Sequence, residues 1–179
     1  MCVAFISWAA GGQVWAAPAE DPENLEYRVK AAFQYKFAGY VEWPEAIFAQ
    51  PTTPVTIGVM GADPVAAELS QLVVGRTVNN RTITVRRLKP GEPLSGVHIL
   101  FVGGTESARL NQVLPLAQPR AILTVTESEG ALAQGSVINF TVAERRVRFE
   151  ISLGSAEKSK LKLSSRLLAV AQQVHTGTP

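Results

Sequence analysis

The amino-acid sequence predicts a single α/β domain, a three-layer sandwich in which helices flank a mixed, mostly parallel sheet with a C-terminal antiparallel hairpin. Strand-like and helix-like segments alternate from residue 55 to residue 125, and residues 97–102 are almost uniformly apolar. Residues 146–153 alternate polar with apolar side chains. With 179 residues, of which 46% are hydrophobic and 18% charged, the chain can bury one core without disulfides or metal.

The N-terminal residues 1–17 contain no charged side chain and resemble a signal peptide. The apolar run from Val3 to Ala10 is too short to span about 30 Å of hydrocarbon, and the small residues around Ala16 are typical of a cleavage site. A disordered tail is the alternative. We expect export, a flexible segment at 18–26, a folded domain at 27–175, and no direct membrane insertion after cleavage.

Charge and cysteine content exclude two classes of function. The formal net charge is only +2, so we expect no nucleic-acid partner, which would select a strongly basic surface. The only cysteine, Cys2, lies in the segment expected to be removed. Without it the chain has no thiol for a disulfide or a thiolate metal site, and we expect no metal and no cofactor.

The first half of the chain predicts a helix, a strand and a second helix. Residues 23–40 form the first helix, which Trp43-Pro44 ends. Residues 55–60 form a buried strand, and Asp63 and Pro64 then follow as N-cap and first helical residue. The apolar stripe of the first helix comprises Val29, Phe33, Phe37, Tyr40 and Val41, and that of the second Val65, Leu69, Leu72 and Val73.

The second half continues this alternation and then changes. Residues 81–87, 97–102 and 121–125 are expected as strands, with a helix carrying Leu110, Val113, Leu114 and Ala117 before the last of them. Residues 137–142 and the alternating segment after them predict the antiparallel hairpin. A final helix is expected from Ser155 to Val174, with an apolar stripe of Leu163, Leu167, Val170, Ala171 and Val174.

No catalytic constellation emerges from the sequence. His98 lies in an apolar strand and is interpreted as a core histidine, and His175 lies near the C-terminus. Ser107 and Ser155 stand at expected helix starts and outside any G-x-S-x-G pattern. Neither a dinucleotide fingerprint nor a phosphate loop is present. We therefore expect no catalytic residue.

Glycine-rich turns follow two of the predicted strands and mark a candidate ligand crevice. Because ligands bind beyond the carboxyl ends of strands in open α/β sheets, these turns would converge if the strands are neighbours. The alternative is that the glycines only permit tight strand-to-helix turns. The candidate crevice consists of Gly61, Asp63, Gly103, Gly104 and Thr105.

Basic residues flank the hairpin turn and follow the hairpin. They are interpreted as a candidate rim that meets an acidic protein surface, and a solvated face is the alternative. The candidate partner-binding rim consists of Arg145, Arg146, Arg148, Lys158 and Lys162.

Six short motifs together resemble the YfiR family of periplasmic proteins. They are KAAFQYKFA at 30–38, VEWP at 41–44, HILF at 98–101, INF at 138–140, VRFEI at 147–151 and LSSRLL at 163–168. The resemblance implies a non-catalytic α/β regulator that binds the periplasmic sensor region of an inner-membrane diguanylate cyclase and represses cyclic-di-GMP synthesis. Val97 stands where described relatives carry a cysteine, so disulfide control is not implied for this chain.

Other hypotheses of function stay open. The partner could be another sensor with a periplasmic domain, and self-association is undecided. A second hypothesis is a periplasmic small-ligand-binding protein, accessory to a sensor histidine kinase or a transport system, that uses the candidate crevice. A third is an enzyme, either a hydrolase or a flavin protein.

Overall fold

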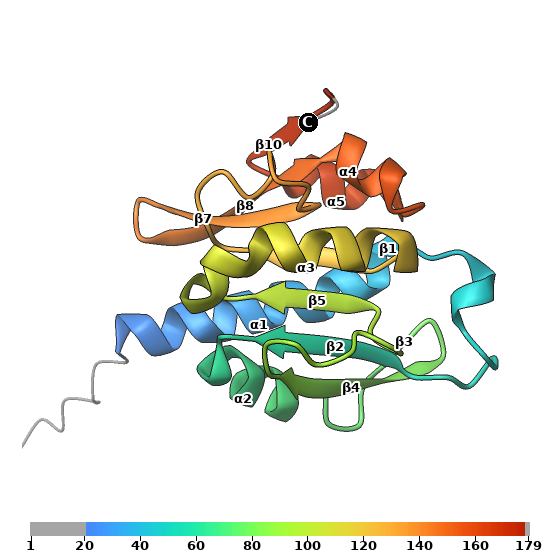
Figure 1. Ribbon diagram of the computed structural model, residues 1–179. Coiled ribbons are helices and arrows are strands. Elements are labelled where there is room, and N and C mark those ends of the chain that lie inside the picture. Colours follow the sequence, from blue (N-terminus) through green and yellow to red (C-terminus); the bar gives the residue numbers. More distant parts are fainter. Residues whose placement is uncertain (1–20, 178–179) are drawn as a thin grey trace, which may run out of the picture.

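The computed structural model describes residues 21–177, so the expected signal peptide and residues 18–20 lie outside the described residues. An eight-stranded sheet runs in the order β10-β8-β7-β6-β5-β2-β4-β3 (Figure 1). Its strands are β2 Val55–Met60, β3 Thr77–Val78, β4 Arg81–Leu88, β5 Ile99–Val102, β6 Leu123–Thr126, β7 Ile138–Ala143, β8 Arg146–Ser152 and β10 Gln173–His175. A separate two-stranded sheet pairs β1 Val41–Glu42 with β9 Lys162–Leu163.

Strand directions match the expected mixed sheet. The strands β4, β2, β5, β6 and β7 run parallel, while β8 is antiparallel to β7. The β7–β8 turn contains only Glu144 and Arg145, both with positive φ, 51° and 59°. Positive φ at both positions is the geometry of the tight turn that fits the twist of a hairpin. The predicted C-terminal antiparallel hairpin is confirmed.

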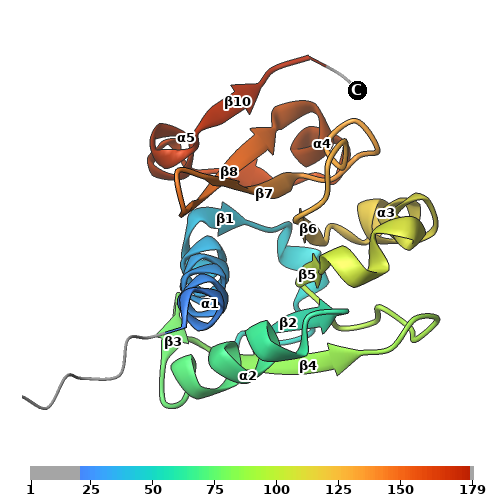
Figure 2. The same ribbon diagram turned by 90° about the vertical axis from the view of Figure 1, so that its left-hand side faces the viewer.

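Helices cover both faces of this sheet (Figure 2). On one face lie α1 Pro22–Tyr40 and α2 Asp63–Leu72, and on the other lies α3 Leu110–Ala117. Shorter helices complete the layers: η1 Glu45–Ile47, η2 Gly104–Arg109, η3 Gln118–Arg120, α4 Leu153–Lys158 and α5 Ser165–Val170. The predicted three-layer α/β sandwich is therefore confirmed.

The sheet separates two apolar cores. Ile99 and Phe101 of β5 point into the core under α1 and α2, while Leu100 and Val102 point into the core under α3. All four side chains are fully buried, as expected for a strand that is apolar at every position. The uniform apolarity of this segment thus reflects its central place between two helical layers.

The buried face of α1 differs from the predicted stripe. Phe37 and Val41 are buried, but Val29, Phe33 and Tyr40 are only half-buried. Besides Phe37, the buried positions of the helix are two alanines and two polar residues: Lys30, Ala31, Gln34 and Ala38. Apolar periodicity did not reveal this face, because it includes two long polar side chains.

An aromatic cluster docks the middle of α1 on the hairpin strands. The ring of Phe33 lies 5.2 Å from that of Phe149, and Phe37 lies 5.9 Å from Phe140. Offset and edge-to-face pairs at such distances add to the energy of area burial. The helix is consequently fixed over β7 and β8 as well as over the parallel strands.

The predicted C-terminal helix from Ser155 to Val174 is wrong. The segment consists of α4, β9, α5 and β10, with Lys160 at φ +56° breaking the first helix. The Ser164 hydroxyl accepts from the Leu167 N–H and starts α5 as its N-cap. Of the predicted apolar stripe only Leu167 is buried, whereas Val170 is 61% exposed. Strand pairing of β9 with β1 and of β10 with β8 outweighed helical propensity here.

Two helix starts also shift. Ala62 is the N-cap of α2, and Asp63 is its first helical residue instead of the predicted cap. Helix α1 begins at Pro22 after an Asp21 cap, one residue before the predicted start at residue 23. Pro22 occupies the first turn, where the missing N–H costs nothing.

His98 closes the core at the amino edge of the sheet. It is 3% exposed, its Nδ1 accepts a hydrogen bond from the Thr56 N–H at 3.1 Å, and its ring stacks on Phe48 at 4.7 Å. Burial, and then the positive charge of Arg81, lower the pKa of His98 below its ordinary value of 6.5. The histidine is thus held as a neutral acceptor within the core.

This lowered pKa predicts acid sensitivity. Below pH 6.5 the unfolded chain binds a proton that the folded chain resists, so the free energy of unfolding should fall as pH decreases through this range. In His98→Asn, whose side-chain oxygen can still accept from Thr56, this part of the pH dependence should disappear. Urea unfolding between pH 8 and pH 5 measures it, with His175→Gln as the control. An unchanged slope in His98→Asn would contradict the assignment.

Candidate functional site

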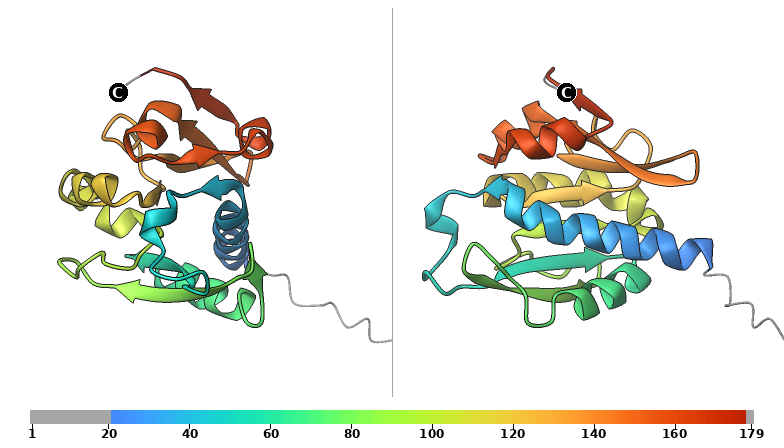
Figure 3. Two further views of the ribbon diagram at one scale, coloured as in Figure 1. Left: turned by 90° about the vertical axis from the view of Figure 1, so that its right-hand side faces the viewer. Right: turned by 180° about the vertical axis from the view of Figure 1, so that it is seen from behind.

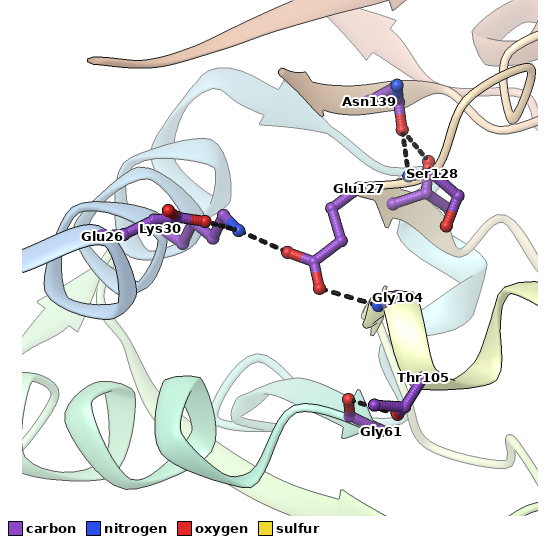
Figure 4. Close-up of polar contacts among 9 residues, drawn as sticks. Glu26, Lys30, Gly61, Gly104, Thr105, Glu127, Ser128 and Asn139 are labelled. Carbon is purple, nitrogen blue, oxygen red and sulfur yellow. Dashed lines mark hydrogen bonds and ion pairs between the residues drawn. The ribbon is translucent and has the colours of Figure 1, made fainter. Parts of the chain in front are cut away.

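The two glycine turns of the candidate crevice do converge at the carboxyl edge of the sheet. The Gly103 N–H donates to the Met60 carbonyl at 2.8 Å, and the Thr105 hydroxyl donates to the Gly61 carbonyl at 2.8 Å (Figure 4). A Cβ on Gly103 would lie 2.3 Å from the Gly61 oxygen. Only glycine permits this approach, so the space between the two turns is filled by protein.

The remaining crevice residues lie apart or are already bonded. The side chain of Asp63 is 84% exposed and lies 3.9 Å from the guanidinium of Arg87. The Gly104 N–H, which a bound anion would use, donates to Glu127 Oε1 at 2.7 Å. Ligand binding by the five predicted residues therefore stays a prediction. A ligand would have to compete with the Glu127 carboxylate for the Gly104 N–H.

Glu127 is the residue at this edge that contacts both α1 and the turn after β5. It follows β6 directly, and its second oxygen, Oε2, lies 2.5 Å from the Nζ of Lys30 on α1. Lys30 also pairs with Glu26 one turn earlier on the same helix. Figure 4 shows the Glu127 carboxylate between the Lys30 ammonium and the backbone of Gly104. One side chain thus joins α1 to the turn after β5.

Lys30 stays charged although only 5% of it is exposed. Burial alone would lower the pKa of Lys30, but the hydrogen bonds and negative charges of Glu127 and Glu26 outweigh burial and raise it. A lysine with a raised pKa is a cation that does not release its proton at neutral pH. Its role here is to hold the two carboxylates rather than to act as a base.

Asn139 fixes the backbone on both sides of Glu127. Its Oδ1 accepts from the Thr126 hydroxyl at 2.8 Å and from the Ser128 N–H at 3.1 Å. Thr126 and Asn139 are both buried, so these bonds are shielded from water. Strand β7 therefore holds the segment from Thr126 to Ser128, while α1 holds the Glu127 carboxylate itself.

A groove of ≈ 660 Å³ opens beside this network, and we call it the carboxyl-edge groove. It lies between the first turns of α1, the segment after β6 and strand β7. Its lining residues are Glu26, Tyr27, Lys30, Gly104, Glu127, Ser128, Glu129, Gly130, Asn139, Phe140, Thr141, Val142 and Glu150. Within residues 21–177, no three or more His, Cys, Asp and Glu side chains gather as metal ligands.

The basic rim divides into two groups at opposite ends of β8 (Figures 1 and 3). Arg145, Arg146 and Arg148 are exposed at the hairpin tip. Lys158 ends α4 and Lys162 lies on β9, beyond the other end of β8. Arg148 is the third of the seven residues of β8, so about 13 Å of strand lies between it and the end of β8 that is nearer to the lysines. Contact of either group with a partner stays a prediction.

Sequence reasoning did not find Lys30 and Glu127. Glu127 could have been noticed as an acidic residue directly after a buried strand, and Lys30 as a cation on the inner side of a helix. Their pairing joins residues 97 positions apart, and no local pattern encodes it.

None of the helices in the described part of the chain is long and apolar enough to span a bilayer.

The Lys30–Glu127 pair should contribute measurably to stability. Lys30→Met or Glu127→Gln should each lower the free energy of unfolding by about 1–3 kcal/mol, because each leaves a shielded charge with fewer partners. The double variant should lose less than the sum. Urea unfolding measures all three, and Glu157→Gln, on an exposed face of α4, is the control. Additive losses would show that the two residues are not coupled.

The chain resembles known proteins in fold and in sequence. It shares its fold with a conserved domain protein of Vibrio cholerae O1 biovar El Tor strain N16961, with a TM-score of 0.54 at 9% identity. The likeness covers 83% of this chain and 60% of that structure, so the chain spans less than two thirds of its length. The family model described as YfiR/HmsC-like matches residues 27–172. The chain therefore belongs to the YfiR/HmsC-like family, as its six motifs predicted.

Proposed function

We propose that this protein is a non-catalytic periplasmic regulator. It binds the periplasmic sensor region of an inner-membrane signalling protein, represses a diguanylate cyclase and so limits cyclic-di-GMP signalling. Membership of a periplasmic and generally regulatory family supports this proposal. Export by a signal peptide in residues 1–17 is part of the same proposal.

One structural observation favours binding over catalysis. Open α/β sheets usually bind substrates at their carboxyl edge. At that edge of this protein, the Glu127 carboxylate accepts a hydrogen bond from the Gly104 N–H and forms an ion pair with Lys30. A substrate anion would have to displace this carboxylate before it could use either group. The edge is therefore better suited to holding α1 on the sheet than to turning over a ligand.

The hairpin arginines are the exposed cations best placed to meet a partner. Arg145 lies in the two-residue turn, and Arg146 and Arg148 lie on the strand after it, in a hairpin that projects from the sheet (Figure 1). Arginine suits recognition of carboxylates because its planar guanidinium donates two parallel hydrogen bonds. Lys158 and Lys162, at the far end of β8, serve as a matched basic pair for comparison.

Capture from solubilised inner membrane tests the proposal. The purified chain should retain a membrane protein that carries a periplasmic domain, and adding the chain should lower cyclic-di-GMP synthesis by that protein. Arg145→Glu with Arg146→Glu should weaken the capture and reduce its salt dependence, because charge steers association. Lys158→Glu with Lys162→Glu shows whether the partner also contacts the second group of the rim, and Lys89→Glu, at an exposed position outside the rim, is the control.

Two results would oppose this proposal. If nothing membrane-bound is retained, the regulatory role loses its main support. If charge reversal at Arg145 and Arg146 leaves affinity unchanged, the partner binds elsewhere.

A second candidate is a small-ligand-binding protein that is accessory to a sensor histidine kinase or transport system. A cavity of ≈ 720 Å³ at the amino edge, lined among others by Trp43, Phe48 and Arg81, favours it. The Trp43 Nε1 is buried there without a hydrogen-bond partner among the described residues. A ligand bound there should raise the melting temperature with increasing concentration, and Trp43→Phe should reduce that shift. A broad panel of small molecules that gives no shift would exclude this candidate.

A further inference from the structure

Strand β7 is longer than the strand beside it. It pairs with β6 only at Ile138 and Asn139, although it continues to Ala143. On its other side β8 accompanies it along its whole length, from Ile138 to Ala143. The segment from Phe140 to Ala143 therefore has a strand neighbour on one side only within residues 21–177.

The register of the hairpin shows which backbone groups face the unpaired side. The Ser152 N–H donates to the Val137 carbonyl, and in an antiparallel ladder such bonded pairs occur at every second residue. Asn139 and Thr141 thus bond to β8, whereas Phe140 and Val142 point their backbone groups away from it. The Phe140 carbonyl and both backbone groups of Val142 remain beyond the end of β6.

These backbone groups face the carboxyl-edge groove. The groove occupies the place where β6 would continue if it ran on past Thr126, and Phe140 and Val142 are among its lining residues. The N-terminal half of α1 and the hairpin project from the same end of the molecule (Figure 3). Val142, 57% exposed, presents an apolar side chain on the same strand. The groove thus offers one strand edge and apolar contact area together.

The charge of the groove is negative. Its charged lining residues are four glutamates and one lysine, and that lysine is already paired with Glu26 and Glu127. Glu129 is exposed at the rim of the groove. Arg146 and Arg148 share with Glu150 the hairpin face away from α1, but neither arginine is among the lining residues of the groove. A cationic segment therefore fits the groove better than an anionic one.

We propose that the carboxyl-edge groove binds an extended, basic segment of a partner protein, which adds as a strand to the free edge of β7. Backbone bonds to Phe140 and Val142 would supply affinity, and Lys or Arg side chains opposite the glutamates would supply specificity. This deepens the proposed function, since it rests on a protein partner and assigns it a surface separate from the arginine tip.

A proline substitution tests the backbone bonds directly. Val142→Pro removes an N–H that β8 does not use, and proline is tolerated at strand edges. The probe is a fluorescent Lys-Val-Lys-Val-Lys-Val-Lys peptide, followed by anisotropy. Val142→Pro should weaken its binding about tenfold, and Val142→Ala, which keeps the N–H, by about threefold or less. Equal effects of the two variants would overturn strand addition.

Charge variants test the chemistry of the partner. Glu129→Lys should weaken binding of the lysine peptide, while Glu157→Lys, on α4, should not. A Glu-Val-Glu-Val-Glu-Val-Glu peptide should not bind. If the glutamate peptide binds as tightly as the lysine peptide, the inference that the partner segment is basic is wrong.

The membrane capture separates this inference from the proposed function. If Val142→Pro, folded by circular dichroism, still retains the membrane partner as well as the native chain does, strand addition is overturned and the regulatory role stands. If the peptides behave as expected but the native chain retains no membrane protein, the groove is supported and the regulatory role fails.

Discussion

The ion pair between Lys30 and Glu127 is the interaction on which the arrangement of this fold depends. It joins the first helix to the carboxyl edge of the sheet, and through Gly104 it also fixes the turn after β5. Asn139 of β7 bonds to the residues on either side of Glu127, so α1, the turn after β5 and strand β7 are all tied to the segment that carries this side chain. A buried charge without partners is costly, so this pair favours the register at which α1 lies on the sheet.

The position of this pair explains why an ordinary α/β sheet can serve as a binding module. In related architectures the edge beyond the parallel strands is open to ligands, because backbone N–H groups there lack partners. Here an internal carboxylate satisfies the Gly104 N–H, and the Gly61 and Gly103 turns pack against each other. The open surface is instead the carboxyl-edge groove beside β7, where backbone groups of that strand lie near glutamate side chains.

Features of the fold that depend on residues close together in the sequence could be predicted, and features that depend on residues far apart could not. Central strands such as 97–102 and the hairpin were predictable, since burial and alternation are local properties. The segment after Ser155 was not, because its strands β9 and β10 exist only through pairing with β1 and β8, far away in sequence. The candidate site followed the same rule: the glycine turns were visible locally, whereas Lys30 and Glu127 acquire their role only from tertiary contact.

Lys30 and Gln34 on the inner face of α1 also bear on the order in which the chain can fold. Gln34 is fully buried with no partner for its amide among the described residues, and Lys30 needs a carboxylate that follows 97 residues later. Until the end of β6 has been synthesised, the ammonium of Lys30 has Glu26 on its own helix as a partner but lacks Glu127, its second carboxylate. The full set of contacts that holds α1 on the sheet is therefore complete only once the end of β6 has been made.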